Sequence, residues 1–150
     1  MKLILIFFFI ILTSCSNSEE ITFYKYNNIT ITRFDNGNMI KLYYGLVKGS
    51  DSISKPHIKA TYYGRDGSMD AYLIIGKDGN VQIVPMGDFF EEKGFDQRLK
   101  LKEFNNNVDF VNWDTRIKNK FDNVIYISSN KNIEIKRNSE NNSNVKAIYQ

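Results

Sequence analysis

Four acidic side chains lie close together in the middle of the 150-residue chain, and carboxylates so spaced could bind a metal ion. They are Asp88, Glu91, Glu92 and Asp96. If these residues formed a helical turn, Asp88 would face Glu91 and Glu92, and the carboxylate oxygens could hold Ca²⁺. The spacing differs from that of an EF-hand loop, and Lys93 and Arg98 stand nearby as counter-charges. The favoured interpretation is therefore a solvated acidic loop without a metal, and a calcium site is the alternative.

The chain contains one histidine, His57, and one cysteine, Cys15. A Ser-His-acid triad would have to use His57, yet no G-x-S-x-G turn that could present a nucleophilic serine occurs. Zinc sites built on histidine need more than one, and a phosphate-binding G-x-G-x-x-G is absent. These features favour a non-catalytic protein without a cofactor. The enzymatic alternative is a carboxylate-dependent enzyme that acts on glycans.

Aromatic side chains provide a candidate binding surface. Tyrosines form two adjacent pairs, at 43–44 and 62–63, and one member of each pair must face outward on a strand. Tyr43, Tyr63 and Trp113 could share an accessible surface on which sugars or peptide groups stack. The simpler interpretation is that these residues decorate a sheet, because aromatic residues have a high strand propensity.

Composition bounds the class of protein. With 42% hydrophobic, 14% aromatic and 25% charged residues, the chain can form one modest domain with a core and a polar surface. The formal net charge is +3 and evenly spread, which is too little for the electrostatic footprint of a nucleic-acid-binding protein. A single cysteine cannot form a disulfide within the chain.

An unbroken apolar run at residues 3–12 follows Lys2. Such a run rises about 15 Å as a helix, half of a roughly 30 Å hydrocarbon core, and is therefore typical of a secretory signal peptide rather than a membrane span. The next residues, Leu12-Thr13-Ser14-Cys15, resemble the lipobox of bacterial lipoproteins. The resemblance implies cleavage before Cys15, a diacylglycerol on its thiol and a fatty acid such as palmitate on its new amino group.

The expected organisation is a signal peptide at 1–14, a lipidated cysteine with a polar tether at 15–20, and a single β-rich domain at 21–150. Two or three acyl chains would hold the protein durably on a membrane without a spanning helix. In Gram-negative lipoproteins the residue after the cysteine influences sorting. Because this residue is Ser16 and not Asp, the resemblance implies the outer membrane, on its periplasmic or surface side.

Strand-like runs separated by turn residues recur every 8–12 residues in most of the first half of the predicted domain, as in antiparallel all-β proteins. The expected strands are 21–26, 29–34, 39–47, 57–63, 69–75 and 81–84. Pairs such as Asp78-Gly79 predict hairpin turns, because both residues accept a positive φ. Alternation predicts that Ile40, Leu42, Tyr44 and Leu46 face the core and that Tyr43 faces outward.

The second half is less regular. Residues 88–93 are expected to form a loop or a short helix, and residues 99–101 a brief strand. Apolar residues recur at helical spacing within 107–120, which predicts a short helix; a bulged strand at 108–113 is the competing interpretation. The remaining expected strands are 123–128, 133–137 and 145–149.

The sequence thus predicts a mainly β domain, an antiparallel meander that closes as a sandwich or a barrel, with one short helix near 107–120. An α+β fold is the alternative. The predicted function is that of a lipid-anchored protein of the cell envelope, whose domain binds an envelope protein or a glycan without catalysis. The alternatives are the glycan-active enzyme and an immunity-type or assembly accessory lipoprotein.

Overall fold

A computed structural model of the chain describes residues 19–49, 54–61, 69–86, 90–102, 123–140 and 146–149. Within these ranges the chain forms ten strands and one helix. They are β1 (Glu20–Tyr26), β2 (Ile29–Asp35), β3 (Met39–Tyr44), β4 (His57–Thr61), β5 (Ala71–Ile75), β6 (Val81–Pro85), β7 (Phe90–Lys93), β8 (Leu99–Leu101), β9 (Val124–Ile127), α2 (Lys131–Glu140) and β10 (Lys146–Tyr149). The predicted mainly β fold is confirmed.

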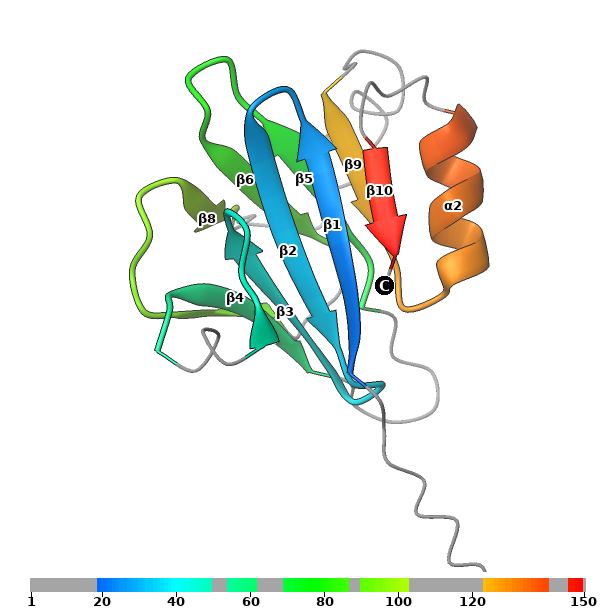
Figure 1. Cartoon of the computed structure of the whole chain (residues 1–150), viewed down its shortest axis with the longest axis horizontal. Helices are drawn as coiled ribbons and strands as arrows, with labels where there is room; N and C mark the ends of the chain where they lie inside the picture. Colours follow the sequence, from blue (N-terminus) through cyan, green and yellow to red (C-terminus); the bar gives the residue numbers. More distant parts are fainter. Residues whose placement is uncertain are drawn as a thin grey trace, which may run out of the picture.

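The strands form two sheets that pack as a sandwich, with β1 and β2 in front of β5 in Figure 1. The six-stranded sheet has the order β10-β1-β2-β3-β4-β7 and is antiparallel throughout. The four-stranded sheet has the order β8-β6-β5-β9, and only β6 and β8 run parallel. Of the two predicted closures, the described strands therefore adopt the sandwich.

The main core lies between the two sheets and follows the predicted alternation along the strands. Ile40 and Leu42 are buried there, and Tyr44 packs against them half-buried. The predicted place of Leu46 in the core is wrong, because β3 ends at Tyr44 and Leu46, beyond its end, is 58% exposed. The four-stranded sheet contributes buried side chains that include Leu73 and Ile83. Because each sheet buries an apolar face against the other, neither sheet would be stable alone.

Two predicted turns are confirmed, and positive φ angles explain their residues. Gly37, with φ of 79°, lies between β2 and β3, and Gly79, with φ of 85°, lies between β5 and β6. Gly79 donates its backbone N–H to the oxygen of Gly76, which closes the β5–β6 turn. An L-residue with a side chain is strained at such a φ, which accounts for glycine at these positions.

The predicted strand at 133–137 is wrong, because these residues belong to α2. The side chain of Asn130 accepts hydrogen bonds from the backbone N–H groups of Asn132 and Ile133, and so caps the start of the helix. Ile133 and Ile135 alternate as they would on a strand, yet both are exposed. The helix instead turns polar residues toward the sandwich, and hydrophobic periodicity could not reveal it.

The predicted loop or short helix at 88–93 is also wrong for its described part, since Phe90–Lys93 form β7 at the edge of the six-stranded sheet. Phe90 packs against the core, and Glu91 lies opposite Lys59 of β4. Strands at 99–101 and at the C-terminal end are confirmed as β8 and β10. Pairing with neighbouring strands, rather than local propensity, decides the structure of these short segments.

Several predictions fall outside the described residues. These are the signal peptide, the lipidated Cys15, most of the tether and the helix at 107–120. The described chain starts one residue before β1, so the predicted tether leads directly into the six-stranded sheet. In the part of the chain that the structure describes, no helix is long and apolar enough to cross a membrane.

Candidate functional site

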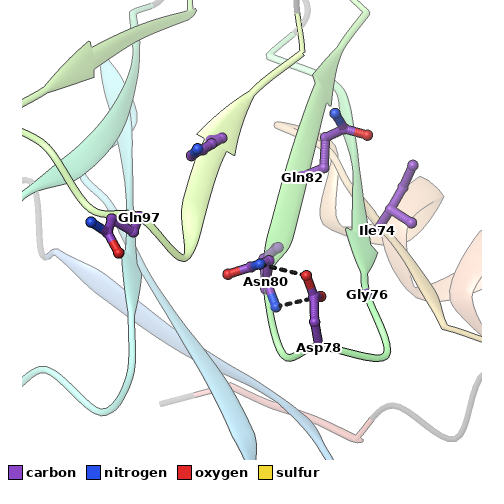
Figure 2. Close-up of a pocket in the computed structure, with 8 residues that line it drawn as sticks. Ile74, Gly76, Asp78, Asn80, Gln82 and Gln97 are labelled. Carbon is purple, nitrogen blue, oxygen red and sulfur yellow. Dashed lines mark hydrogen bonds between the residues drawn. The ribbon is translucent and has the colours of Figure 1, made fainter.

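A shallow pocket of about 230 Å³ lies beside the β5–β6 turn on the outer face of the four-stranded sheet (Figure 2). Its lining residues come from β5, the turn, β6, β8 and the segment just before β8, and they are Ile74, Gly76, Asp78, Asn80, Val81, Gln82, Gln97 and Lys100. Ile74 lies opposite Gln82, which lies opposite Lys100, so these side chains cross the sheet in one row. The pocket thus has two apolar side chains, Ile74 and Val81, among amide and charged groups.

The turn beside the pocket is held in place by its own hydrogen bonds. Asp78 accepts from the backbone N–H of Asn80 at 3.1 Å and from its side-chain amide at 2.6 Å (Figure 2). These bonds, the backbone one first, hold the pKa of Asp78 below its ordinary value. The hydroxyl of Tyr44 donates to the oxygen of Gly79 at 3.0 Å and ties the turn to the six-stranded sheet.

Three side chains of the pocket remain available for a ligand. Gln82, Gln97 and Lys100 make no side-chain hydrogen bond or ion pair with the described residues. Each amide can both donate and accept, and the ammonium of Lys100 donates only. This set can bind a neutral polar ligand, such as a sugar or a peptide backbone, with Ile74 as an apolar contact.

Three of the four acids of the predicted site are described, and they do not lie together. Glu91 forms ion pairs with Lys93 at 2.8 Å and Lys59 at 3.4 Å, and the hydrogen bond from Lys93 is the main reason that the pKa of Glu91 is lowered. Glu92 accepts instead from the backbone N–H of Leu101 at 2.9 Å. Adjacent residues on β7 point to opposite faces, which separates the two carboxylates.

Asp96 has a further, separate environment. Its carboxylate accepts from the backbone N–H of Arg98 at 2.9 Å and forms an ion pair with the guanidinium at 3.3 Å. Burial opposes ionisation, but the bonds from Arg98 hold the pKa of Asp96 below its ordinary value. Asp88 lies outside the described residues, among which no three potential metal ligands come together. The described acids therefore have structural partners rather than a shared ligand.

The expectation that Tyr43 is an exposed, ligand-facing residue is wrong. Tyr43 does point away from the main core, as alternation predicts, but it is only 1% exposed. Its ring packs edge-on against Phe34 at 5.5 Å and beside His57 at 5.0 Å, and Val47 completes this cluster. The segment after β3 covers the ring, which alternation alone cannot show. Tyr63 and Trp113 lie outside the described residues.

A buried ionic network, which the sequence analysis missed, joins α2 to the six-stranded sheet. Arg33 of β2 donates to Glu134 of α2 at 2.6 Å and to the hydroxyl of Tyr24 at 3.2 Å, and it also pairs with Asp35. Tyr24 donates to the second oxygen of Glu134 at 2.8 Å. Burial lowers the pKa of Arg33, but Tyr24, Glu134 and Asp35 more than offset this and raise it. The guanidinium is therefore permanently charged.

The network continues into the four-stranded sheet. The backbone N–H of Ser128, just after β9, donates to Glu134 at 2.9 Å, and the hydroxyl of Ser128 donates to Asp70 at 2.7 Å. Asp70 also accepts from the hydroxyl of Tyr126 at 2.6 Å. Most polar groups of this network have partners within it, which indicates a positioning role rather than a reactive site. The exception among the described residues is the Nε of Arg33, which is buried without a hydrogen-bond partner. One sequence signal was available: Arg33 shares the inward face of β2 with Ile29 and Ile31.

Comparison with known proteins identifies no relative: no family model, no curated protein and no solved structure matches the chain.

Proposed function

We propose that the protein is a lipid-anchored binding domain of the cell envelope, most consistent with the outer membrane, and that it acts without catalysis. The observation that carries this proposal is Leu12-Thr13-Ser14-Cys15, which follows a short apolar run and contains the one cysteine of the chain. Acyl chains on Cys15 would tie the sandwich to the bilayer. The net charge and its distribution along the sequence do not favour nucleic acid as a partner.

The arrangement of the sandwich supports a binding role. The chain enters β1 at Glu20, and the β5–β6 turn lies at the opposite end of the sandwich (Figure 1). The seven residues of β1 span about 20 Å at roughly 3.3 Å per residue. The pocket beside this turn would therefore face away from the anchor, where a glycan or an envelope protein can reach it.

The anchor is tested by metabolic labelling of the full chain with radioactive palmitate in a bacterium that processes lipoproteins. We expect label on the wild type and on Ser14→Ala, which keeps a small residue before the cysteine. Cys15→Ser removes the acceptor thiol and should abolish the label. Mass spectrometry should show an acylated N-terminus at Cys15. An intact Met1 with no label would contradict the proposal.

The binding role is tested by titrating the isotope-labelled protein with soluble oligosaccharides and peptidoglycan fragments. We expect shifts of the side-chain amide signals of Gln82 and Gln97 with at least one of these compounds. Lys100→Ala should weaken that binding several-fold, because it removes the one ammonium among the described lining residues. Lys77→Ala, in the turn but outside the lining, is the matched control. If no compound shifts either amide, the pocket is not the binding site.

A further inference from the structure

The outer face of the six-stranded sheet is strongly basic. Strand pairing places lysines of five strands on this face, and they are Lys25, Lys41, Lys59, Lys93 and Lys146. Lys41 lies directly opposite Lys59, and Lys25 directly opposite Lys146. Like charges that face each other across strands are unfavourable, so their position needs an explanation other than sheet stability.

Acidic side chains are nearly absent from the same face. Glu91 is its one acidic residue among the described strands, and it pairs with Lys59 and Lys93. Five lysines and one glutamate give this face a net charge of +4. Lys25, Lys41 and Lys146 form no ion pair with the described residues. Among the other described acids, Asp35 and Glu134 lie in the buried network at α2, and Asp78 lies in the β5–β6 turn.

The segment after β3 adds apolar and basic groups to the basic face. The side chain of Thr32 accepts from the backbone N–H of Val47 at 3.1 Å and donates to the oxygen of Gly45 at 2.7 Å, so this segment lies over the outer face. Leu46 is 58% exposed between these two anchor points, and Lys48 follows it, also exposed. On β10, next to Lys146, Ile148 is 39% exposed.

We infer that this face, defined by its five lysines together with Leu46, Lys48 and Ile148, binds the anionic lipid headgroups of the bilayer in which the protein is anchored. Lysines near an anionic surface are attracted additively, and exposed aliphatic side chains among them gain by entering the headgroup region. A soluble protein partner would require a complementary acidic surface, whereas anionic lipid supplies that charge wherever the anchor holds the domain.

This inference rests on the proposed lipid anchor, and the anchor makes the contact geometrically feasible. Four residues separate Cys15 from Glu20, and an extended chain covers at most about 3.6 Å per residue. The domain is thus held within roughly one strand length of the headgroups and can rotate to lay the sheet flat on them. In that orientation the pocket beside the β5–β6 turn stays open, because it lies on the other sheet.

The test uses the full-length protein purified from membranes, with its acylation checked by mass spectrometry. It is reconstituted into vesicles of phosphatidylcholine alone or with phosphatidylglycerol. Each lysine is then labelled with an amine-reactive reagent and its rate is read by mass spectrometry. We expect Lys25, Lys41 and Lys146 to react several-fold more slowly on the anionic vesicles, and high salt to restore their rates. Lys77 and Lys100 should not change.

Charge reversal identifies the surface. The triple variant Lys25→Glu, Lys41→Glu, Lys146→Glu should lose the protection of Lys59 by anionic lipid. The matched control, Lys77→Glu, Lys100→Glu, Lys136→Glu, carries the same change of net charge on other surfaces. In this control, anionic lipid should still protect Lys59. Equal rates on neutral and anionic vesicles would overturn the inference. So would equal protection by a soluble polyanion added to neutral vesicles, which would assign the face to free polyanions.

Failure of the anchor is distinguishable from failure of the basic face. An unacylated protein would refute the proposed anchoring, and the wild type and the triple variant would then be compared by sedimentation with anionic vesicles. Stronger sedimentation of the wild type than of the variant would support the lipid-binding face on its own. Equal sedimentation of the two would refute it.

Discussion

Arg33 is a charged side chain placed where a sandwich usually has an aliphatic one. It points inward from β2, in the same row as Leu42 of β3, and its side chain is 8% exposed. Removing a guanidinium from water is costly, and only good partners offset that cost. Glu134, Tyr24 and Asp35 supply them. The arginine therefore fixes where α2 must dock, because Glu134 is the one described carboxylate outside β2 that reaches its guanidinium.

The Arg33–Glu134 pair predicts a severe effect of breaking one side only. Glu134→Gln removes the negative charge, leaves the buried guanidinium with less compensation, and should lower the free energy of unfolding by about 3–5 kcal/mol. The double variant Arg33→Met, Glu134→Leu removes both charges and should be less destabilised than the single one. Urea unfolding followed by circular dichroism measures both.

A matched control for this pair is Glu19→Gln, which changes an exposed glutamate and should shift the free energy of unfolding by less than about 0.5 kcal/mol. If Glu134→Gln were as mild as this control, Arg33 would not depend on Glu134, and the docking role of the pair would be wrong.

At the scale of elements, α2 protects an edge of the four-stranded sheet. Asn138 accepts from the backbone N–H of Tyr126 and donates to its oxygen, both at 2.8 Å, so one side chain takes the place of a neighbouring strand. Arg137 lies over the ring of Tyr126 at 4.3 Å and donates to the hydroxyl of Tyr72. An open edge would invite pairing with another chain, and the helix prevents this along β9.

Strands with clear alternation and flanking turns were predictable from the sequence, and α2 was not. β2 and β3 turn alternate apolar residues toward the main core, as their period predicts. Burial itself does not alternate, because Phe34 and Tyr43 on the outer face are covered as well. The described polar contacts of α2 with the sandwich come from Lys131, Glu134, Arg137 and Asn138, and its isoleucines are exposed. A helix with a polar buried face has no hydrophobic period to detect. Its cap at Asn130 was the available signal.

Neither the pocket nor the basic face could be predicted from the sequence, because both depend on how the strands pair. Gln82 and Lys100 are distant in sequence and become neighbours only through the parallel pairing of β6 with β8. The lysines of the basic face appear evenly spread along the chain, which predicts no charged patch. Antiparallel register collects them on one face, and a one-residue shift in any pairing would disperse them.

For the molecule as a whole, two buried tyrosines predict a loss of stability at alkaline pH. Burial raises the pKa of Tyr24 well above its ordinary value of 10.0. Burial, and then the hydrogen bond to Asp70, raise the pKa of Tyr126. The folded state thus keeps protons that the unfolded chain releases above pH 10.0. The stabilisation is fully present below that pH and declines as the pH rises toward the folded-state values.

This pH dependence is measured by urea unfolding at about pH 8 and about pH 11, on either side of the ordinary tyrosine pKa. We expect the wild type to lose free energy of unfolding between the two. Tyr126→Phe removes a hydrogen bond and should therefore be less stable than the wild type at the lower pH. Between the two pH values, however, its free energy of unfolding should fall by less than that of the wild type. Parallel losses in both proteins would show that Tyr126 is not responsible.

The pairing of β1 with β10 has a consequence for biogenesis. The first described strand completes its sheet only with the last one, and Arg33 reaches Glu134 across 101 positions of the sequence. While ribosomes are still making the protein, the emerging segment therefore lacks both its edge partner and its counter-charge. Such a segment cannot complete its fold before the chain is finished, which suits the passage through a translocation channel that the proposed lipid anchor requires. Once the whole chain had crossed the channel, completion of the fold would prevent it from moving back.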